Sequence, residues 1–220
     1  MYLFPNAAPP EANRQAVNEA GRVVGATTVL FHEGDSADTL YEVVTGVFRA
    51  TKVFPDGRRQ VVAFAYPGDI IGFGHGSAYR FDCDALTPGR VHATGRGEML
   101  QAMRDRPELG ERLLSMAADE IATMQDLSIL LCRKSAMERI AGFLISLAAR
   151  TGKEENEQRV SLPMCRADIA DHLGLTIETV SRNMTKLRAR GIIDLPDRGS
   201  FVIRDLERLR ELSECETVTH

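Results

Sequence analysis

Residues 165–191 read CRADIADHLGLTIETVSRNMTKLRARG. On either side of Gly174, apolar residues recur at the spacing of a helix that buries one face: Ile169, Ala170 and Leu173, then Val180, Met184 and Leu187. Gly174 gives the backbone the freedom that a tight turn between two helices needs, and Thr176 stands at the N-cap position of the second helix. The pattern predicts a helix-turn-helix of the DNA-binding kind.

The second of these helices is positively charged. Residues 176–190 contain four basic residues and one acidic residue, a balance of +3, whereas the whole chain has a formal net charge of -4. Glu178, Ser181 and Arg182 share one face near the helix N-terminus, the end that enters a major groove. There, Arg can donate to guanine and a carboxylate can accept from cytosine, so we expect these three residues to contact bases. The phosphate contacts are expected from Thr176, Thr179, Lys186 and Arg188. An ordinary amphipathic helix with a solvated charged face is the alternative.

Two β-prone runs follow, GIIDL at 191–195 and SFVI at 200–203, joined by the turn sequence PDRG at 196–199. A hairpin directly after a helix-turn-helix makes a winged helix. We therefore assign residues 134–220 to a winged helix-turn-helix domain. Its first helix is expected over 135–150, with four residues facing inward: Ile140, Phe143, Leu144 and Leu147.

Three motifs in this region resemble the bacterial CRP/FNR family of transcription regulators: ADIADHLGLT at 167–176, ETVSR at 178–182, and the Gly-Ile-Ile that begins the hairpin. Within the family, LPMCRADIADHLGLTIETVSR at 162–182 is similar to the FixK branch, which regulates nitrogen fixation and microaerobic respiration. The resemblance implies an activator that recruits RNA polymerase and binds a palindrome with TTGAT and ATCAA half-sites. The cyclic-AMP branch has an Arg where this chain has Ile177.

The 220 residues are enough for two domains, each with its own core. Hydrophobic residues make up 44% of the chain and charged residues 26%, as in ordinary globular proteins. No apolar run is long enough for a membrane span. The N-terminal MYLFPNAAPPEANR lacks the basic and apolar regions of a signal peptide. We therefore expect a flexible N-terminal arm over 1–20 and a cytoplasmic protein.

The four cysteines are far apart in the sequence, and no two have the C-x-x-C or C-x-C spacing of a metal site: Cys83, Cys132, Cys165 and Cys215. The oxygen-sensing members of the family that the chain resembles hold an iron–sulfur cluster on an N-terminal group of cysteines. The first 82 residues of this chain contain no cysteine. We therefore expect free thiols, no metal and no cofactor.

Residues 21–106 are assigned to a β-roll domain, because short β-prone runs alternate here with Gly, Pro and Asp turns. The clearest strands are expected at 28–31, 40–44, 47–50 and 61–64. FHEGD at 31–35 and YPGDIIG at 66–72 resemble the family's cyclic-nucleotide-binding jelly roll, so the expected fold class is α+β. The family's nucleotide pocket has a Gly-Glu pair and an Arg-Ser or Arg-Thr pair. Here Arg80 precedes Phe81 and no Glu lies at the ribose position, so we expect no bound nucleotide.

Two histidines of the β-roll allow other interpretations. A metal-dependent cupin enzyme is also a small β-barrel, but it needs an H-x-H pair, which neither His32 nor His75 provides. His75 lies between two glycines and could ligate a haem, as in some gas-sensing relatives in the family, although a surface loop histidine is the simpler interpretation. We expect no enzyme activity, and a regulator gated by haem or a nucleotide is the alternative function.

Residues 107–133 have helical periodicity and are assigned to a dimerisation helix, along which two seven-residue seams can be drawn. One seam contains Leu113, Ala117, Glu120, Met124, Leu127 and Leu131. The other contains Leu114, Ala117, Ile121, Met124, Ser128 and Leu131. Burying an unpaired carboxylate costs more than burying a hydroxyl, so we expect the second seam to pair in a homodimer and Leu113 to face the β-roll. A helix buried within a monomer is the alternative.

The resemblance adds a prediction about this helix. In the family's iron–sulfur oxygen sensor, an acidic residue opposes dimerisation until the cluster binds, and the similarity of QDLSILLCRKSAMERI at 125–140 places Met124 at that position. We therefore expect a homodimer that binds DNA without an effector, on half-sites about one helical turn apart.

Cys165 stands at the start of the first motif helix, where backbone N–H groups and the helix dipole favour a thiolate. In the family this point comes close to a DNA phosphate, so the resemblance makes Cys165 a phosphate contact and a candidate for redox control. Oxidation to a sulfinic or sulfonic acid would add negative charge there and weaken DNA binding. A small residue that only fills the helix start is the alternative.

Overall fold

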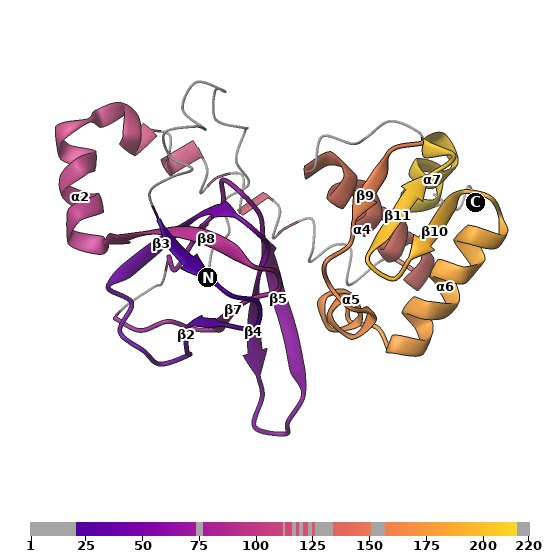
Figure 1. Cartoon of the computed structure of the whole chain (residues 1–220), viewed down its shortest axis with the longest axis horizontal. Coiled ribbons are helices and arrows are strands. Elements are labelled where there is room, and N and C mark those ends of the chain that lie inside the picture. Colours follow the sequence, from indigo (N-terminus) through magenta and orange to yellow (C-terminus); the bar gives the residue numbers. More distant parts are fainter. Residues whose placement is uncertain are drawn as a thin grey trace, which may run out of the picture. The chain divides into compact units, whose positions relative to one another are not determined.

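The computed structural model describes residues 21–73, 77–111, 113–115, 118, 121–122, 125, 134–150 and 157–214. The chain divides into two compact units, residues 1–125 and 126–220 (Figure 1). The predicted arm at 1–20 lies outside the described residues, as do His75, Cys132 and Cys215. The predicted domain boundaries at 106/107 and 133/134 stay predictions.

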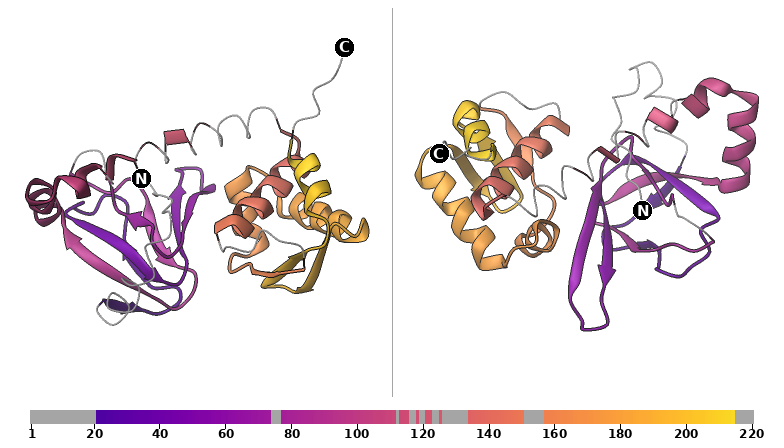
Figure 2. Two further views of the ribbon diagram at one scale, coloured as in Figure 1. Left: turned by 90° about the horizontal axis from the view of Figure 1, so that it is seen from above. Right: turned by 180° about the vertical axis from the view of Figure 1, so that it is seen from behind.

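The N-terminal unit contains two antiparallel four-stranded sheets, with strand orders β1-β8-β3-β6 and β2-β7-β4-β5. In Figures 1 and 2, β4 and β5 form a long hairpin that extends from the end of the second sheet. The strands span Arg22–Val24 (β1), Val29–Phe31 (β2), Thr39–Thr45 (β3), Phe48–Val53 (β4), Arg59–Ala65 (β5), Ile70–Ile71 (β6), Asp82–Ala85 (β7) and Gly89–Gly95 (β8). The four strands expected from the sequence correspond to β2 through β5, and the β-roll is confirmed.

Side chains alternate between the two faces of these strands, as the two-residue period of a β-strand requires. In β4, Phe48 and Ala50 are buried, whereas Arg49 between them pairs with Asp84 of β7 at 2.8 Å. Buried residues from both sheets and from the segments between their strands form one cluster: Val24, Leu30, Phe31, Ala37, Tyr41, Val43, Phe48, Ala65, Ile71, Tyr79, Cys83, Ala85 and Val91. The two sheets therefore share a single apolar core.

Helix α2 (Arg96–Asp105) follows β8 and packs near a second apolar cluster. This cluster contains Leu40, Ile70 and Leu113, with Phe73, Met99, Met103 and Leu109 packed against it. Leu113 is 7% exposed because it lies against the β-roll, whereas Leu114 beside it is 73% exposed. Of the two predicted seams, the observation supports the one that contains Leu114. Its members Ala117, Met124, Ser128 and Leu131 lie outside the described residues.

The C-terminal unit combines helices with a small three-stranded sheet of order β10-β11-β9. Its elements are α4 (Ala136–Arg150), β9 (Arg159–Ser161), α5 (Arg166–Leu173), α6 (Ile177–Ala189), β10 (Ile193–Asp197), β11 (Ser200–Ile203) and α7 (Leu206–Ser213). The predicted inner face of α4 is buried, and so are the predicted apolar faces of α5 and α6. With a β-roll first and a winged helix-turn-helix second, the predicted α+β fold class is confirmed.

The first strand of the hairpin begins and ends two residues later than predicted. Gly191 belongs to the turn that follows α6, since its φ is +68° and its N–H donates to the carbonyl of Arg188 at 2.9 Å. The strand β10 therefore begins at Ile193, and it continues to Asp197. The Asp197 carboxylate accepts a hydrogen bond from the N–H of Gly199 at 2.8 Å, which closes the turn over Arg198 and Gly199 alone.

Helix α7 was not among the elements expected from the sequence. Asp205 caps it, because the Asp205 carboxylate accepts a hydrogen bond from the N–H of Arg208 at 3.0 Å. Leu209 is fully buried, and α7 packs against α4. The spacing of Leu206, Leu209 and Leu212 after an aspartate is the signal that could have predicted this helix.

Candidate DNA-binding site

The turn between α5 and α6 is fixed by Gly174. This residue adopts a left-handed conformation (φ 63°, ψ 41°), and its N–H donates to the carbonyl of Ala170, which ends α5. The N–H of Leu175 donates to the same carbonyl at 2.9 Å. Ala170 is 1% exposed and carries only a methyl group, so the second helix can cross closely over the first. The predicted helix-turn-helix geometry is present.

Thr176 caps α6 as predicted. Its hydroxyl accepts a hydrogen bond from the N–H of Thr179 at 3.2 Å, and the hydroxyls of the two threonines lie 3.0 Å apart. The Thr176 hydroxyl also donates to the carboxylate of Glu178, so the proton shared between the two threonines comes from Thr179. Both hydroxyl protons are therefore used within the chain, and the phosphate contacts expected from the two threonines stay a prediction.

The outer face of α6 is polar and exposed. Glu178, Ser181 and Arg182 are all exposed in the first turns of the helix, and Lys186 and Arg188 are exposed further along it. The opposite face is buried and consists of Val180, Asn183, Met184 and Leu187. Asn183 remains satisfied there, because its amide donates to the carbonyl of Thr179 at 2.8 Å. Of the six predicted base and phosphate contacts within α6, five are exposed and Thr179 is half-buried.

Glu178 carries a negative charge in this position. Hydrogen bonds from its own backbone N–H and from the Thr176 hydroxyl hold the pKa of Glu178 below its usual value of 4.5, and the nearby Arg182 lowers it further. The helix N-terminus also favours an anion. The carboxylate is thus an acceptor at neutral pH, which is the form that can accept from the amino group of cytosine.

Cys165 is the N-cap residue of α5 and is exposed. Its Sγ lies 3.1 Å from Oδ2 of Asp168, and its backbone N–H donates to the same oxygen at 3.1 Å. Asp168 is only 3% exposed. The sequence interpretation found the helix start at Cys165 but overlooked this partner, although Cys-x-x-Asp at 165–168 has the spacing of a capping box. Any change at the sulfur therefore also changes the cap of α5.

Two further residues of this surface were not foreseen. Arg166 follows Cys165, and partial burial lowers the pKa of its guanidinium, while no described residue forms an ion pair with it. Ile177 is the first residue of α6 and is 48% exposed, next to Glu178. Ile177 therefore presents a large apolar side chain at the N-terminal end of α6.

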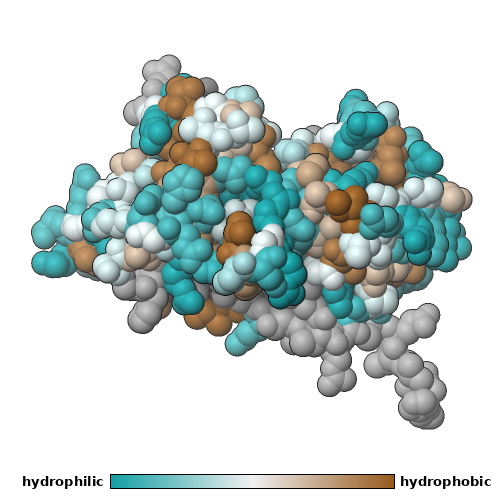
Figure 3. Space-filling view, turned by 90° about the horizontal axis from the view of Figure 1, so that it is seen from below, coloured by the Kyte–Doolittle hydropathy of each residue, from teal (hydrophilic) through white to brown (hydrophobic). Residues whose placement is uncertain are grey.

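The wing lies beside these helices in the same unit and is internally braced. Arg159 of β9 donates to the Ser200 hydroxyl at 3.0 Å and pairs with Asp197. Hydrogen bonds from Gly199 and Ser200 lower the pKa of Asp197 from its usual value of 3.8, so its carboxylate remains charged at neutral pH. The bracing leaves Arg198 exposed at the tip of the turn. Figure 3 shows one face of the whole chain, on which hydrophilic side chains predominate and apolar side chains form separate patches.

In the β-roll, Asp69 of the YPGD turn is buried and hydrogen-bonded within that turn. Asp69 is 1% exposed, and its carboxylate accepts from the N–H of Tyr66 at 2.9 Å. His32 pairs with Asp82 at 3.2 Å. Within the described parts of the chain, no group of three or more His, Cys, Asp or Glu residues could hold a metal ion, and no helix is long and apolar enough to cross a membrane. Arg80 is exposed, and His75 lies outside these parts.

Comparison with known proteins identifies the same two domains, the β-roll and the helix-turn-helix domain. Residues 22–106 match the family model of the cyclic nucleotide-binding domain, and residues 138–212 match that of the Crp-like helix-turn-helix domain. The chain belongs to the CRP/FNR family of transcription regulators, and within it the chain is FixK-like.

Three relatives support this assignment. The transcriptional activatory protein AadR of Rhodopseudomonas palustris is 43% identical over 175 residues, which cover 79% of this chain and 73% of AadR. The nitrogen fixation regulation protein FixK of Rhizobium meliloti is 41% identical over 183 residues, 83% of this chain and 82% of FixK. The solved structure of FixK2 from Bradyrhizobium japonicum superimposes with a TM-score of 0.82 at 34% identity, covering 89% of this chain and 97% of FixK2.

Proposed function

We propose that this regulator is a sequence-specific activator that binds a TTGAT-N4-ATCAA-like palindrome as a homodimer and recruits RNA polymerase. The observation that carries the proposal is the exposed face formed by Glu178, Ser181 and Arg182 at the N-terminus of α6. A charged acceptor and a guanidinium, one turn apart, can accept from the cytosine and donate to the guanine of the single G·C pair in each TTGAT half-site. Lys186, Arg188, Arg166, Cys165 and the two threonines are the proposed phosphate contacts.

The FixK relatives are described as regulators of nitrogen fixation, and we propose that this chain controls genes of nitrogen fixation or microaerobic metabolism. No described feature of the β-roll requires an effector. Asp69, the acid of the YPGD turn, is buried and hydrogen-bonded within that turn, and Arg80 is exposed. We therefore propose that the dimer is competent to bind DNA without a small molecule.

The first prediction is that purified, reduced protein binds the palindromic duplex at about 0.15 M salt without any added ligand. A scrambled duplex of the same composition is the control for non-specific phosphate binding, and the affinity ratio should be roughly 10³ or more. Fluorescence anisotropy measures both affinities. Equally weak binding to both duplexes would contradict effector independence, and addition of haem or cyclic AMP would then identify a ligand-gated regulator.

Cys165 is the proposed point of redox control, and its surroundings make the mechanism more specific. A sulfinate or sulfonate at Cys165 would place a second anion about 3 Å from the buried carboxylate of Asp168. The same anion would also face the DNA phosphate that Cys165 is proposed to contact. Both effects disfavour DNA binding, because one repels the phosphate and the other opens the cap of α5. Cys83 is fully buried and burial raises the pKa of its thiol, so Cys83 should be inert to peroxide.

The second prediction follows from this arrangement. Peroxide should lower the DNA affinity of the wild-type protein by roughly tenfold, about 1.4 kcal/mol, and should leave a Cys165→Ser variant unchanged. Serine is a matched replacement because its hydroxyl can make the same contacts with Asp168 and cap the same helix. Mass spectrometry of tryptic peptides should find Cys165 oxidised and Cys83 reduced. Equal loss of affinity in both proteins would remove Cys165 from the mechanism.

A further inference from the structure

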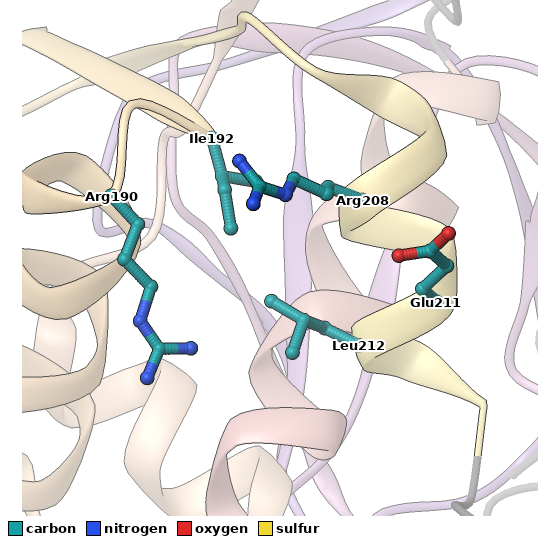
Figure 4. A pocket seen from close by; sticks show the side chains of 5 residues that line it. All are labelled: Arg190, Ile192, Arg208, Glu211 and Leu212. Carbon is teal, nitrogen blue, oxygen red and sulfur yellow. The ribbon is translucent and has the colours of Figure 1, made fainter.

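A recess of about 370 Å³ lies at the far end of α6, between the end of that helix and α7. Five residues line it: Arg190, Ile192, Arg208, Glu211 and Leu212. Figure 4 shows Arg190 on one side and Leu212 of α7 on the other, with both side chains directed toward the space between them. The guanidinium of Arg208 lies beside Ile192, and Glu211 lies on α7 between Arg208 and Leu212.

The floor of the recess is apolar and held in place by the backbone. Ile192 is 3% exposed, and its carbonyl accepts hydrogen bonds from the N–H groups of Arg204 and Asp205 at 2.9 and 3.1 Å. These bonds tie the start of α7 to the segment that follows α6. Leu212 is half-buried on the facing side. Because both walls are anchored, the recess is a preformed feature of the C-terminal unit.

The rim of the recess is cationic, because two arginine side chains that form no ion pair within the described chain lie there. Arg190 and Arg208 are exposed, and neither guanidinium makes a hydrogen bond or an ion pair with any described residue. Two guanidinium groups and one carboxylate leave a net positive charge around an apolar floor. The complementary ligand is a carboxylate carried next to a bulky apolar group, since guanidinium binds carboxylates in paired hydrogen bonds.

The recess lies away from the base-reading end of the recognition helix. Helix α6 has 13 residues, so about 20 Å separate its two ends. In Figure 1 the helix runs, within the C-terminal unit, from the turn after α5 toward α7. Arg208 and Leu212 belong to α7 and not to the helix that enters the groove, so they remain accessible on DNA-bound protein, whereas Arg190 lies two residues from the proposed phosphate contact Arg188.

We infer that this recess is a docking site for an acidic segment of RNA polymerase, in which a carboxylate side chain lies next to a large apolar side chain. The carboxylate pairs with Arg190 and Arg208, and the apolar side chain packs on Ile192 and Leu212. The inference rests on the proposed activator function, because a surface that stays open on a promoter is of use to a regulator that recruits polymerase. A DNA phosphate is the competing ligand, since Arg190 adds to the basic charge of residues 176–190.

The test uses the full chain and the double variant Arg190→Ala/Arg208→Ala. Direct binding of RNA polymerase holoenzyme to the immobilised protein is measured without DNA, and affinity for the palindromic duplex is measured separately. The double variant should bind polymerase at least tenfold more weakly and bind DNA within about twofold of wild type. Arg210→Ala is the matched control, because Arg210 lies on the same helix outside the recess, and it should change neither value.

Three results would overturn the inference. One is a double variant that binds polymerase as well as wild type. Another is a loss of DNA affinity as large as the loss of polymerase binding, which would assign both arginines to phosphates. The third is a wild-type protein that does not bind polymerase at all, which would contradict the proposed recruitment of polymerase itself, whereas the first two results leave that function intact. Failure of the proposed DNA-binding function is distinguishable from all three, because it would show only in the duplex measurement.

Discussion

A Met124→Asp variant is expected to be monomeric and to bind the palindrome roughly 10²- to 10⁴-fold more weakly than wild type, because the two half-sites can then no longer be bound by one linked pair of domains. At the centre of the predicted seam, two carboxylates would face each other across the two-fold axis, and burying them without a partner is unfavourable. The exposed residues of the seam support this register. Leu114 is 73% exposed and Ile121 is 51% exposed in the single chain, and large apolar side chains at that spacing indicate a surface that a partner covers.

Sedimentation and anisotropy with the same duplex measure the two parts of this prediction. Met124→Leu is the matched control, because it keeps the position apolar and of similar volume, and it should remain a dimer with unchanged DNA affinity. A dimeric Met124→Asp protein with full affinity would show that the chains pair through another surface. A monomeric wild-type protein would favour the helix buried within a monomer.

An Arg182→Ala variant is expected to lose about 1–3 kcal/mol of specific binding, a factor of roughly 5 to 150, and to lose discrimination at one base pair in each half-site. Arg182 is exposed on the first turns of α6, next to a Glu178 carboxylate that stays ionised. A guanidinium there can donate to both acceptors of a guanine, and alanine offers neither bond.

Arg188→Ala separates base reading from phosphate binding. Arg188 is exposed near the other end of α6, and its loss should weaken binding to all duplexes alike and lower the salt dependence by about one phosphate contact. Competition with duplexes changed at single base pairs measures both variants. If Arg182→Ala keeps the full preference for the palindrome over every single-pair change, Arg182 does not read a base.

Short-range patterns were sufficient to predict the recognition element. The apolar faces of α4, α5 and α6, the glycine turn at Gly174 and the Thr176 cap all depend on residues within four positions of one another, so their geometry follows from helix periodicity and capping. The exposed Glu178, Ser181 and Arg182 follow from the same periodicity, since they lie opposite the buried face. The contact of Cys165 with Asp168 is equally local and was overlooked rather than unpredictable.

Features that depend on distant parts of the chain were decided only by the folded structure. The period of the predicted dimer helix allows two seams, and the burial of Leu113 against Leu40 and Ile70 of the β-roll favours the one that contains Leu114, which stays a prediction. The recess exists because the chain after α6 and the helix α7 are tied together through the carbonyl of Ile192. Periodicity fixes which side of a helix is apolar, but it carries no information about which other element covers that side. That choice is made when the whole chain packs its apolar surfaces together.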